Sequence, residues 1–200
     1  MVSSMAYSPA NPQQGSSDPG PASTGRIRPI EPADVPTVHR LICELAEYER
    51  EPDAVVATAD DLAAALFGGA DTPHGHPSLF GLVAEVDRQV VGMALWFLNY
   101  STWRGTHGIY LEDLYVSPEF RGRGLGKEML AELAAECVRR GYRRLEWWVL
   151  DWNESAIDFY RSVQAEAMAE WTVFRLADEA LAALAAEDRR HNGDGGVSGA

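Results

Sequence analysis

The residues with the clearest capacity for chemistry lie between Pro118 and Lys127, in the string PEFRGRGLGK. Gly122, Gly124 and Gly126 alternate there, between an apolar stretch typical of a strand and a pattern typical of a helix. Glycines let a backbone turn tightly and leave its N–H groups uncovered, and a helix N-terminus adds partial positive charge. The segment therefore predicts a cradle for phosphate oxygens, with a ligand-free strand-to-helix turn as the structural alternative.

The spacing of these glycines excludes two common phosphate-binding loops. A P-loop has four residues between its glycines and a Ser or Thr after its Lys, whereas three residues separate Gly122 from Gly126 and Glu128 follows Lys127. The dinucleotide fingerprint G-x-G-x-x-G also fails, because the pattern here is G-x-G-x-G.

A second constellation is the string VLDWNESAIDFY, which ends at Tyr160. An apolar run stops at Asn153, a residue that suits a helix N-cap. The helix that follows places Tyr160 about two turns in. A tyrosine at such a position serves either as a core residue or as an acid–base group beside the phosphate loop.

The third feature is the acidic pair Glu112-Asp113 inside the apolar stretch Ile109–Val116. Neighbouring residues of a regular strand face opposite sides, so only one of the two carboxylates can point into a given cleft. A charge within an apolar strand is costly unless it is paired, which indicates either a functional group or a structural ion pair.

Helical and strand periodicities elsewhere predict the elements that position these residues. Strands are expected over residues 26–30, 79–86, 89–100, 109–116, 145–150 and 171–176. Helices are expected from a first turn that holds Pro32 and Asp34 to Tyr48, and over 59–67, 124–140, 155–163 and 177–186. This order indicates an α/β fold in which a single mixed sheet carries helices on both faces.

The length and composition of the chain are typical of one soluble globular domain. Residues 1–24 and 189–200 are poor in large apolar side chains and are predicted to be a disordered N-terminal arm and a flexible C-terminal tail around a domain at 25–188. The net charge of −13 argues against nucleic acid and membrane partners. Cys43 and Cys137 lie in helical patterns and imply no disulfide, no signal sequence is recognisable, and a cytoplasmic location is expected. His74-Gly75-His76 has no companion ligands, so no metal is expected.

Together these motifs resemble the GNAT superfamily of N-acetyltransferases, whose pyrophosphate signature R-x-x-G-x-G matches Arg121, Gly124 and Gly126. Within it the chain resembles the diamine acetyltransferases, of the spermidine/spermine and thialysine types, and the thialysine type more closely. The segments that carry this resemblance are IRP at 27–29, LAEYE at 45–49, YLEDLYV at 110–116, residues 121–127 (the glycine loop) and VLDWN at 149–153.

The resemblance implies the GNAT fold, acetyl-CoA as co-substrate, a small cationic amine as acceptor, and a homodimer. The implied cofactor-binding residues are Leu114, Tyr115, Val116, Arg121, Gly122, Arg123, Gly124, Leu125, Gly126, Lys127, Asn153, Glu154, Ala156 and Tyr160. The implied amine-binding residues are Tyr48, Glu49, Glu112, Glu146, Trp147 and Trp148. Glu112 would accept the proton of the ammonium, directly or through water, and Tyr160 would protonate the leaving thiolate.

The chain departs from the family pattern at two places. Gln164 stands where the family usually has Gly, and the loop at 166–170 is shorter, which leaves Glu170 as a weak candidate for an acidic contact. Two other functions fit the same motifs: acetylation of protein lysines or N-termini, and a non-catalytic acetyl-CoA-binding module.

Overall fold

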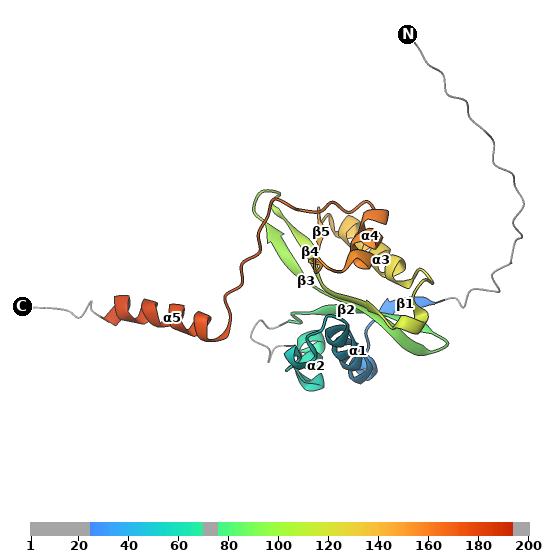
Figure 1. Ribbon diagram of the computed structural model, residues 1–200, viewed down its shortest axis with the longest axis horizontal. Helices are drawn as coiled ribbons and strands as arrows, with labels where there is room; N and C mark the ends of the chain where they lie inside the picture. The colour runs from blue at the N-terminus through green and yellow to red at the C-terminus, as the bar shows by residue number, and fades with distance from the viewer. Residues whose placement is uncertain (1–24, 70–75, 194–200) are drawn as a thin grey trace, which may run out of the picture. The chain divides into compact units, whose positions relative to one another are not determined.

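The computed structural model describes residues 25–69 and 76–193, which form two compact units that divide between Leu150 and Asp151 (Figure 1). The predicted arm at 1–24 lies outside these residues, and the single domain predicted over 25–188 stays a prediction. In the part of the chain that the structure describes, no helix has the length and apolar content to cross a bilayer.

The first unit is built on one five-stranded mixed sheet. Its strands are β1 (Arg26–Pro29), β2 (Phe80–Val86), β3 (Gln89–Ser101), β4 (Thr106–Val116) and β5 (Leu145–Glu146). They lie in chain order, and the pairings are antiparallel except for the parallel pair β4–β5. Asp87 and Arg88, with φ of 50° and 65°, form the tight turn of the β2–β3 hairpin, in the two-residue gap between the strands predicted at 79–86 and 89–100.

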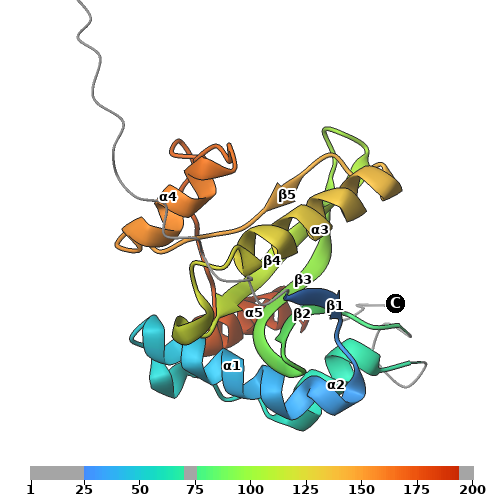
Figure 2. The ribbon, with the colours of Figure 1, turned by 90° about the vertical axis from the view of Figure 1, so that its right-hand side faces the viewer.

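Helices cover both faces of this sheet, as predicted (Figure 2). The helices α1 (Val35–Tyr48) and α2 (Ala59–Phe67) pack on one face, and α3 (Leu125–Arg140) packs on the other. Thr58 and Asp61 form the capping box that starts α2. Short 3-10 turns are η1 (Pro32–Asp34), η2 (Pro52–Ala54) and η3 (Pro118–Phe120).

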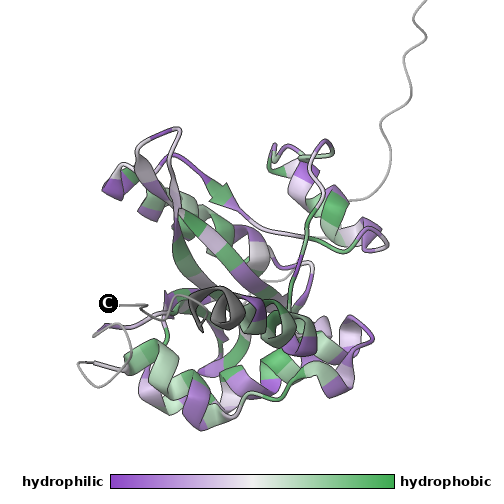
Figure 3. Ribbon diagram, turned by 90° about the vertical axis from the view of Figure 1, so that its left-hand side faces the viewer, coloured by the Kyte–Doolittle hydropathy of each residue, from purple (hydrophilic) through white to green (hydrophobic). Residues whose placement is uncertain are grey.

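The core lies between the helices and the central strands, along which hydrophobic residues alternate with more hydrophilic ones (Figure 3). Val38 and Leu41 of α1 and Met93 of β3 are completely buried. Met129 and Leu133 of α3 are buried equally well, at 0% and 1% exposure. This packing fixes the ends of α1, β4 and α3, from which the candidate site is built.

The second unit holds α4 (Glu154–Ser162) and α5 (Asp178–Gly193). The predicted start of the last helix is right within a residue, but the helix continues to Gly193 rather than ending near Ala186. Its added turns take in the first residues of the tail predicted to be flexible.

One predicted strand is shorter than expected, and another is absent. Only Leu145 and Glu146 of the expected strand at 145–150 pair with a neighbour, and residues 171–176 form no strand. The side chains at 171–176 are all exposed, with Phe174 at 91%. Alternating apolar residues suit a strand, but a strand also needs a hydrogen-bonding neighbour, which the local pattern does not specify.

Candidate active site

The glycine loop forms the N-terminus of the 16-residue helix α3. Gly122 and Gly124 have φ of 75° and 86°, in the left-handed region that glycine adopts without strain. A Cβ at Gly122 would meet no atom within 4 Å, so the space above the backbone is open. In the described parts of the chain, no backbone carbonyl accepts a hydrogen bond from the amides of residues 122–127. The arrangement fits a diphosphate, as the sequence predicts.

Strand β4 leads into this loop with one edge unpaired. Leu114, Tyr115 and Val116 pair with β3 on one side, whereas β5 pairs with β4 only at Ile109 and Tyr110. Within the described residues, β4 beyond Tyr110 therefore has no strand neighbour on its β5 side. These backbone groups are available to an extended ligand, and their pairing with a pantetheine arm stays a prediction.

The acidic pair lies at a β-bulge in β4. Leu95 of β3 is opposite Asp113, and Trp96 is opposite Leu111, so Glu112 is the extra residue. Glu112 is exposed, whereas Asp113 is half-buried. The bulge interrupts the regular alternation of side chains along β4. The rule that neighbouring residues face opposite sides of a strand therefore does not apply to Glu112 and Asp113.

Asp113 is the acidic residue of this region whose pKa is shifted most. Burial, followed by the negative charges of Glu112 and Glu49, raises the pKa of Asp113 to about 7. Burial also raises the pKa of Glu49, which caps the C-terminus of α1. The structure therefore brings Glu49, Glu112 and Asp113 close enough to interact electrostatically. The sequence singled out Glu112 and Asp113 as an acidic pair, but the resemblance gave site roles to Glu49 and Glu112 and none to Asp113.

Glu146 and Trp148, two of the predicted amine-site residues near the end of the first unit, contact other side chains of the protein. Glu146 accepts a hydrogen bond of 2.6 Å from the Asn99 side chain and lies 3.3 Å from Arg144. Trp148 is 56% exposed and meets the ring of Tyr110 edge-on at 5.7 Å. These contacts tie Glu146 to β3 and to Arg144 just before β5, and its role toward an amine, like that of Trp147 and Trp148, stays a prediction.

The second unit shows the predicted helix cap. The Asn153 side chain accepts a hydrogen bond of 3.2 Å from the amide of Ala156 and so caps α4, whose first residue is Glu154. Tyr160 lies on this helix, half-buried, with its ring 5.3 Å from that of Phe159. The cofactor and acid roles of these residues stay predictions.

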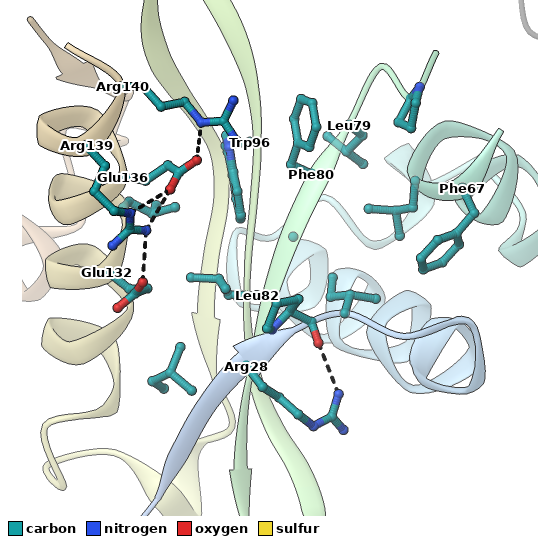
Figure 4. A pocket seen from close by; sticks show the side chains of 17 residues that line it. Arg28, Phe67, Leu79, Phe80, Leu82, Trp96, Glu132, Glu136, Arg139 and Arg140 are labelled. Atoms are coloured by element: carbon teal, nitrogen blue, oxygen red, sulfur yellow. Dashed lines mark hydrogen bonds and ion pairs between the residues drawn. The ribbon is translucent and has the colours of Figure 1, made fainter. Parts of the chain in front are cut away.

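A separate groove of about 380 Å³ lies beside β1 and contains none of the predicted site residues (Figure 4). Phe67, Phe80 and Trp96 supply its aromatic walls, and Phe80 stacks on Trp96 at 6.0 Å. Its charged side chains are already paired: Arg28 with Asp34 and Glu85, and Arg139 and Arg140 with acids of α3. The groove therefore offers no free carboxylate to an ammonium group.

No metal centre is found in the described residues, where no group of three His, Cys, Asp or Glu side chains could hold an ion. His74 lies outside these residues. Cys43 and Cys137 are both free thiols.

Comparison with known proteins agrees with this geometry. The family model described as "Acetyltransferase (GNAT) family" matches residues 38–164, which include the acidic bulge, the glycine loop and α4. The chain belongs to the GNAT family of acetyltransferases. It is therefore an acyltransferase, and the GNAT fold predicted from its motifs is confirmed.

Two curated relatives and one solved structure illustrate the similarity. The thialysine N-epsilon-acetyltransferase of Bos taurus is 40% identical over 170 residues, covering 80% of this chain and 96% of the relative. The L-ornithine N5-acetyltransferase of Arabidopsis thaliana is 32% identical over 198 residues, covering 80% and 87%. An integron cassette protein from the mobile metagenome of V. cholerae has a TM-score of 0.66 at 25% identity, covering 80% and 97%.

Proposed function

We propose that this acetyltransferase moves the acetyl group of acetyl-CoA directly to a primary amine of a small cationic diamine-type molecule, such as thialysine, a lysine-like amino acid or a polyamine. The observation that carries the proposal is the row of open amides at the start of α3, beside the unpaired edge of β4. The similarity to thialysine and ornithine acetyltransferases supports a small amine as the acceptor.

The proposed cofactor site uses mainly backbone groups. The amides of residues 122–127 would bind the diphosphate of coenzyme A, because they are open and lie at the positive end of α3. The free edge of β4 at Leu114–Val116 would pair with the amide-containing pantetheine arm. An N–H group of the same edge would polarise the thioester carbonyl.

The proposed amine site uses side chains. An alkylammonium has a pKa near 10.4 and must lose a proton before it can attack. The carboxylates of Glu49, Glu112 and Asp113 would attract the cation, and Glu112 would accept its proton directly or through a water. The nitrogen then bonds to the acetyl carbon, the carbon–sulfur bond breaks, and Tyr160 would give its proton to the thiolate. The second proton that the nitrogen loses in becoming an amide would restore the Tyr160 hydroxyl.

Asp113 is a second candidate for the proton acceptor, because a pKa of about 7 suits a base that works near neutral pH. Glu112→Gln and Asp113→Asn would separate the two in pH–rate profiles. The variant that loses the acidic limb of the profile identifies the base. A Glu112→Gln profile that overlays that of the parent would assign the role to another group.

Two other functions compete with this one: acetylation of protein lysines or N-termini, and acetyl-CoA binding without catalysis. A thiol-release assay with acetyl-CoA against thialysine, ornithine, lysine, spermidine and a lysine-containing peptide distinguishes all three. We expect release with a small diamine-type acceptor and none above background with the peptide. Release only with the peptide would favour the first rival, and no release despite cofactor binding would favour the second.

Calorimetry tests the underlying claim that the glycine loop binds coenzyme A. We expect binding of both coenzyme A and acetyl-CoA by the full chain, and no detectable affinity would contradict the proposal. The homodimer implied by the resemblance, the cytoplasmic location, the lack of a metal requirement, and the absence of nucleic acid and membrane partners also remain proposals. Light scattering of the purified chain would test the dimer.

A further inference from the structure

The side chain of Arg121 is engaged by other groups of the protein rather than extended over the loop. Its Nε donates a hydrogen bond of 2.8 Å to the carbonyl of Val116. Its guanidinium carbon lies 5.0 Å from the ring centre of Tyr48 and 5.4 Å from that of Tyr115. A guanidinium within about 6 Å of an aromatic centroid is attracted to the ring face.

These contacts join three elements that carry different parts of the proposed site. Arg121 begins the glycine loop, Tyr115 and Val116 end β4, and Tyr48 is the last residue of α1. Tyr115 is 5% exposed and belongs to the core, so its ring is a fixed support. Tyr48 is 37% exposed, more than Tyr115, and the contact with Arg121 adds to what holds its ring in place.

A neighbouring contact strengthens the same junction. Ser117 donates a hydrogen bond of 3.2 Å to the carboxylate of Glu44, one turn before Tyr48 on α1. The start of the loop is therefore attached to the C-terminal part of α1 by two independent side-chain contacts.

Arg123, two residues along the loop, provides the contrast. Its guanidinium lies 5.0 Å from the ring centre of Phe120, and it donates a hydrogen bond of 3.5 Å to the carbonyl of Glu119. Both partners belong to η3, directly before the loop. Arg123 thus makes the same type of contact as Arg121 without reaching α1.

We infer that Arg121 is a positioning residue that couples binding of the cofactor at the glycine loop to binding of the amine at the end of α1. The inference rests on the proposed function. A bound diphosphate fixes the loop, the fixed loop holds Arg121, and Arg121 holds the Tyr48 ring beside Glu49. The amine then binds a site that is already ordered, and linkage requires that the amine strengthens cofactor binding by the same factor.

Calorimetry of the full chain measures this coupling without turnover, because coenzyme A carries no acetyl group. Coenzyme A is titrated with and without saturating thialysine, or the acceptor that the amine panel selects, and the ratio of the two dissociation constants is the coupling factor. We expect a factor of at least about five for the parent. Arg121→Lys keeps the charge but loses the planar group that stacks on both rings, and should lower the factor about two- to fivefold.

Three further variants separate coupling from direct binding. Arg123→Lys should leave the coupling factor at the parent value even where its affinity for coenzyme A changes. Tyr48→Phe keeps the ring and should preserve the factor, whereas Tyr48→Leu should lower it as Arg121→Lys does. A parent factor of one, or an unchanged factor in Arg121→Lys, would overturn the inference alone. Failure of the parent to bind coenzyme A at all would overturn the proposed function and the inference with it.

Discussion

The glycine loop and the acidic bulge are two regions of one unit that offer chemistry in opposite ways. The loop presents main-chain amides, held by glycines at φ of 75° and 86°. The bulge presents the side chains of Glu112 and Asp113, and the pKa of Asp113 is raised to about 7. Main-chain amides do not titrate near neutral pH, whereas the acidic cluster changes its charge there. The cofactor region should therefore respond to backbone substitutions and the amine region to pH.

The largest expected effect is on the chemical step, with little change in either binding region. Tyr160→Phe removes only a hydroxyl, and we expect turnover to fall by about one to three orders of magnitude because the leaving thiolate loses its acid. Affinity for coenzyme A should stay within about twofold of the parent, as measured by calorimetry.

Tyr142→Phe is the matched control for this substitution, because Tyr142 follows α3 and belongs to neither binding region. It should keep the turnover of the parent. Equal turnover in Tyr160→Phe and the parent would remove Tyr160 from the role of acid.

A backbone substitution should weaken the cofactor region alone. Gly124 has φ of 86° and is the N-cap of α3, so Gly124→Ala forces an L side chain into the left-handed region at a cost of about 1–2 kcal/mol. The loop then relaxes away from its open geometry, and affinity for coenzyme A should fall about tenfold. The shape of the pH–rate profile should not change.

Gly105→Ala tests whether this loss belongs to the loop. Gly105 has φ of 62° and, like Gly122, has open space where a Cβ would lie, but it belongs to the β3–β4 turn. The substitution should reduce stability without reducing affinity for coenzyme A. Equal losses of affinity in both variants would contradict a specific role for the loop backbone.

A charge substitution in the amine region should alter the pH dependence of stability. Because the pKa of Asp113 is raised in the folded protein, its contribution to stability is complete below the ordinary carboxyl pKa and is lost as pH rises through about 7. Asp113→Asn removes this loss, so Tm should fall less between pH 5 and pH 8 in the variant than in the parent. The difference should be a few degrees, since each kcal/mol corresponds to about 2–4 °C in a chain of this size.

Glu112→Gln refines the same measurement. It removes one of the two negative charges that raise the pKa of Asp113, so its effect on the pH dependence of Tm should lie between the parent and Asp113→Asn. Identical pH dependence in all three proteins would show that Asp113 does not titrate in this range.

The two regions also differ in how well the sequence predicts them. The loop depends on neighbours in the chain: glycines, a preceding strand and a following helix. Its position at the start of α3 was predictable, as was the Asn153 cap of α4. The bulge depends on the register between β3 and β4, where Glu112 has no opposite residue. No local pattern specifies that register, so the sequence identified an acidic pair but not its geometry.

The shortened strand and the absent strand have a similar cause. Residues 145–150 and 171–176 both have apolar patterns, yet only Leu145 and Glu146 find a neighbour in the sheet. The unexpected contact of Arg121 with Tyr48 likewise joins residues far apart in the chain. Propensity and periodicity describe what a segment can form, whereas pairing and cross-element contacts are decided by the whole fold.

The C-terminal ends of α3 and α4 both have a residue with positive φ, and neither residue belongs to a proposed ligand site. At the end of α3, Gly141 has φ of 70°, and the amide of Tyr142 donates to the carbonyl of Cys137 at 2.8 Å. At the end of α4, Gln164 has φ of 64°, and the amide of Ala165 donates to the carbonyl of Tyr160 at 3.1 Å. The two ends share one hydrogen-bonding pattern, but only one of them has the glycine that this pattern favours.

The smallest expected effect comes from exchanging these residues. Gln164→Gly relieves the strain of a side chain in the left-handed region and should raise the free energy of unfolding by about 1 kcal/mol, less the added entropy of glycine in the unfolded chain. Gly141→Gln should lower it by a similar amount, and both changes are measured as shifts of the urea midpoint. A destabilised Gln164→Gly variant would mean that the Gln164 side chain stabilises α4 through contacts of its own. The departure from the family's glycine would then reflect a different use of this helix end, rather than a tolerated strain beside the helix that carries Tyr160.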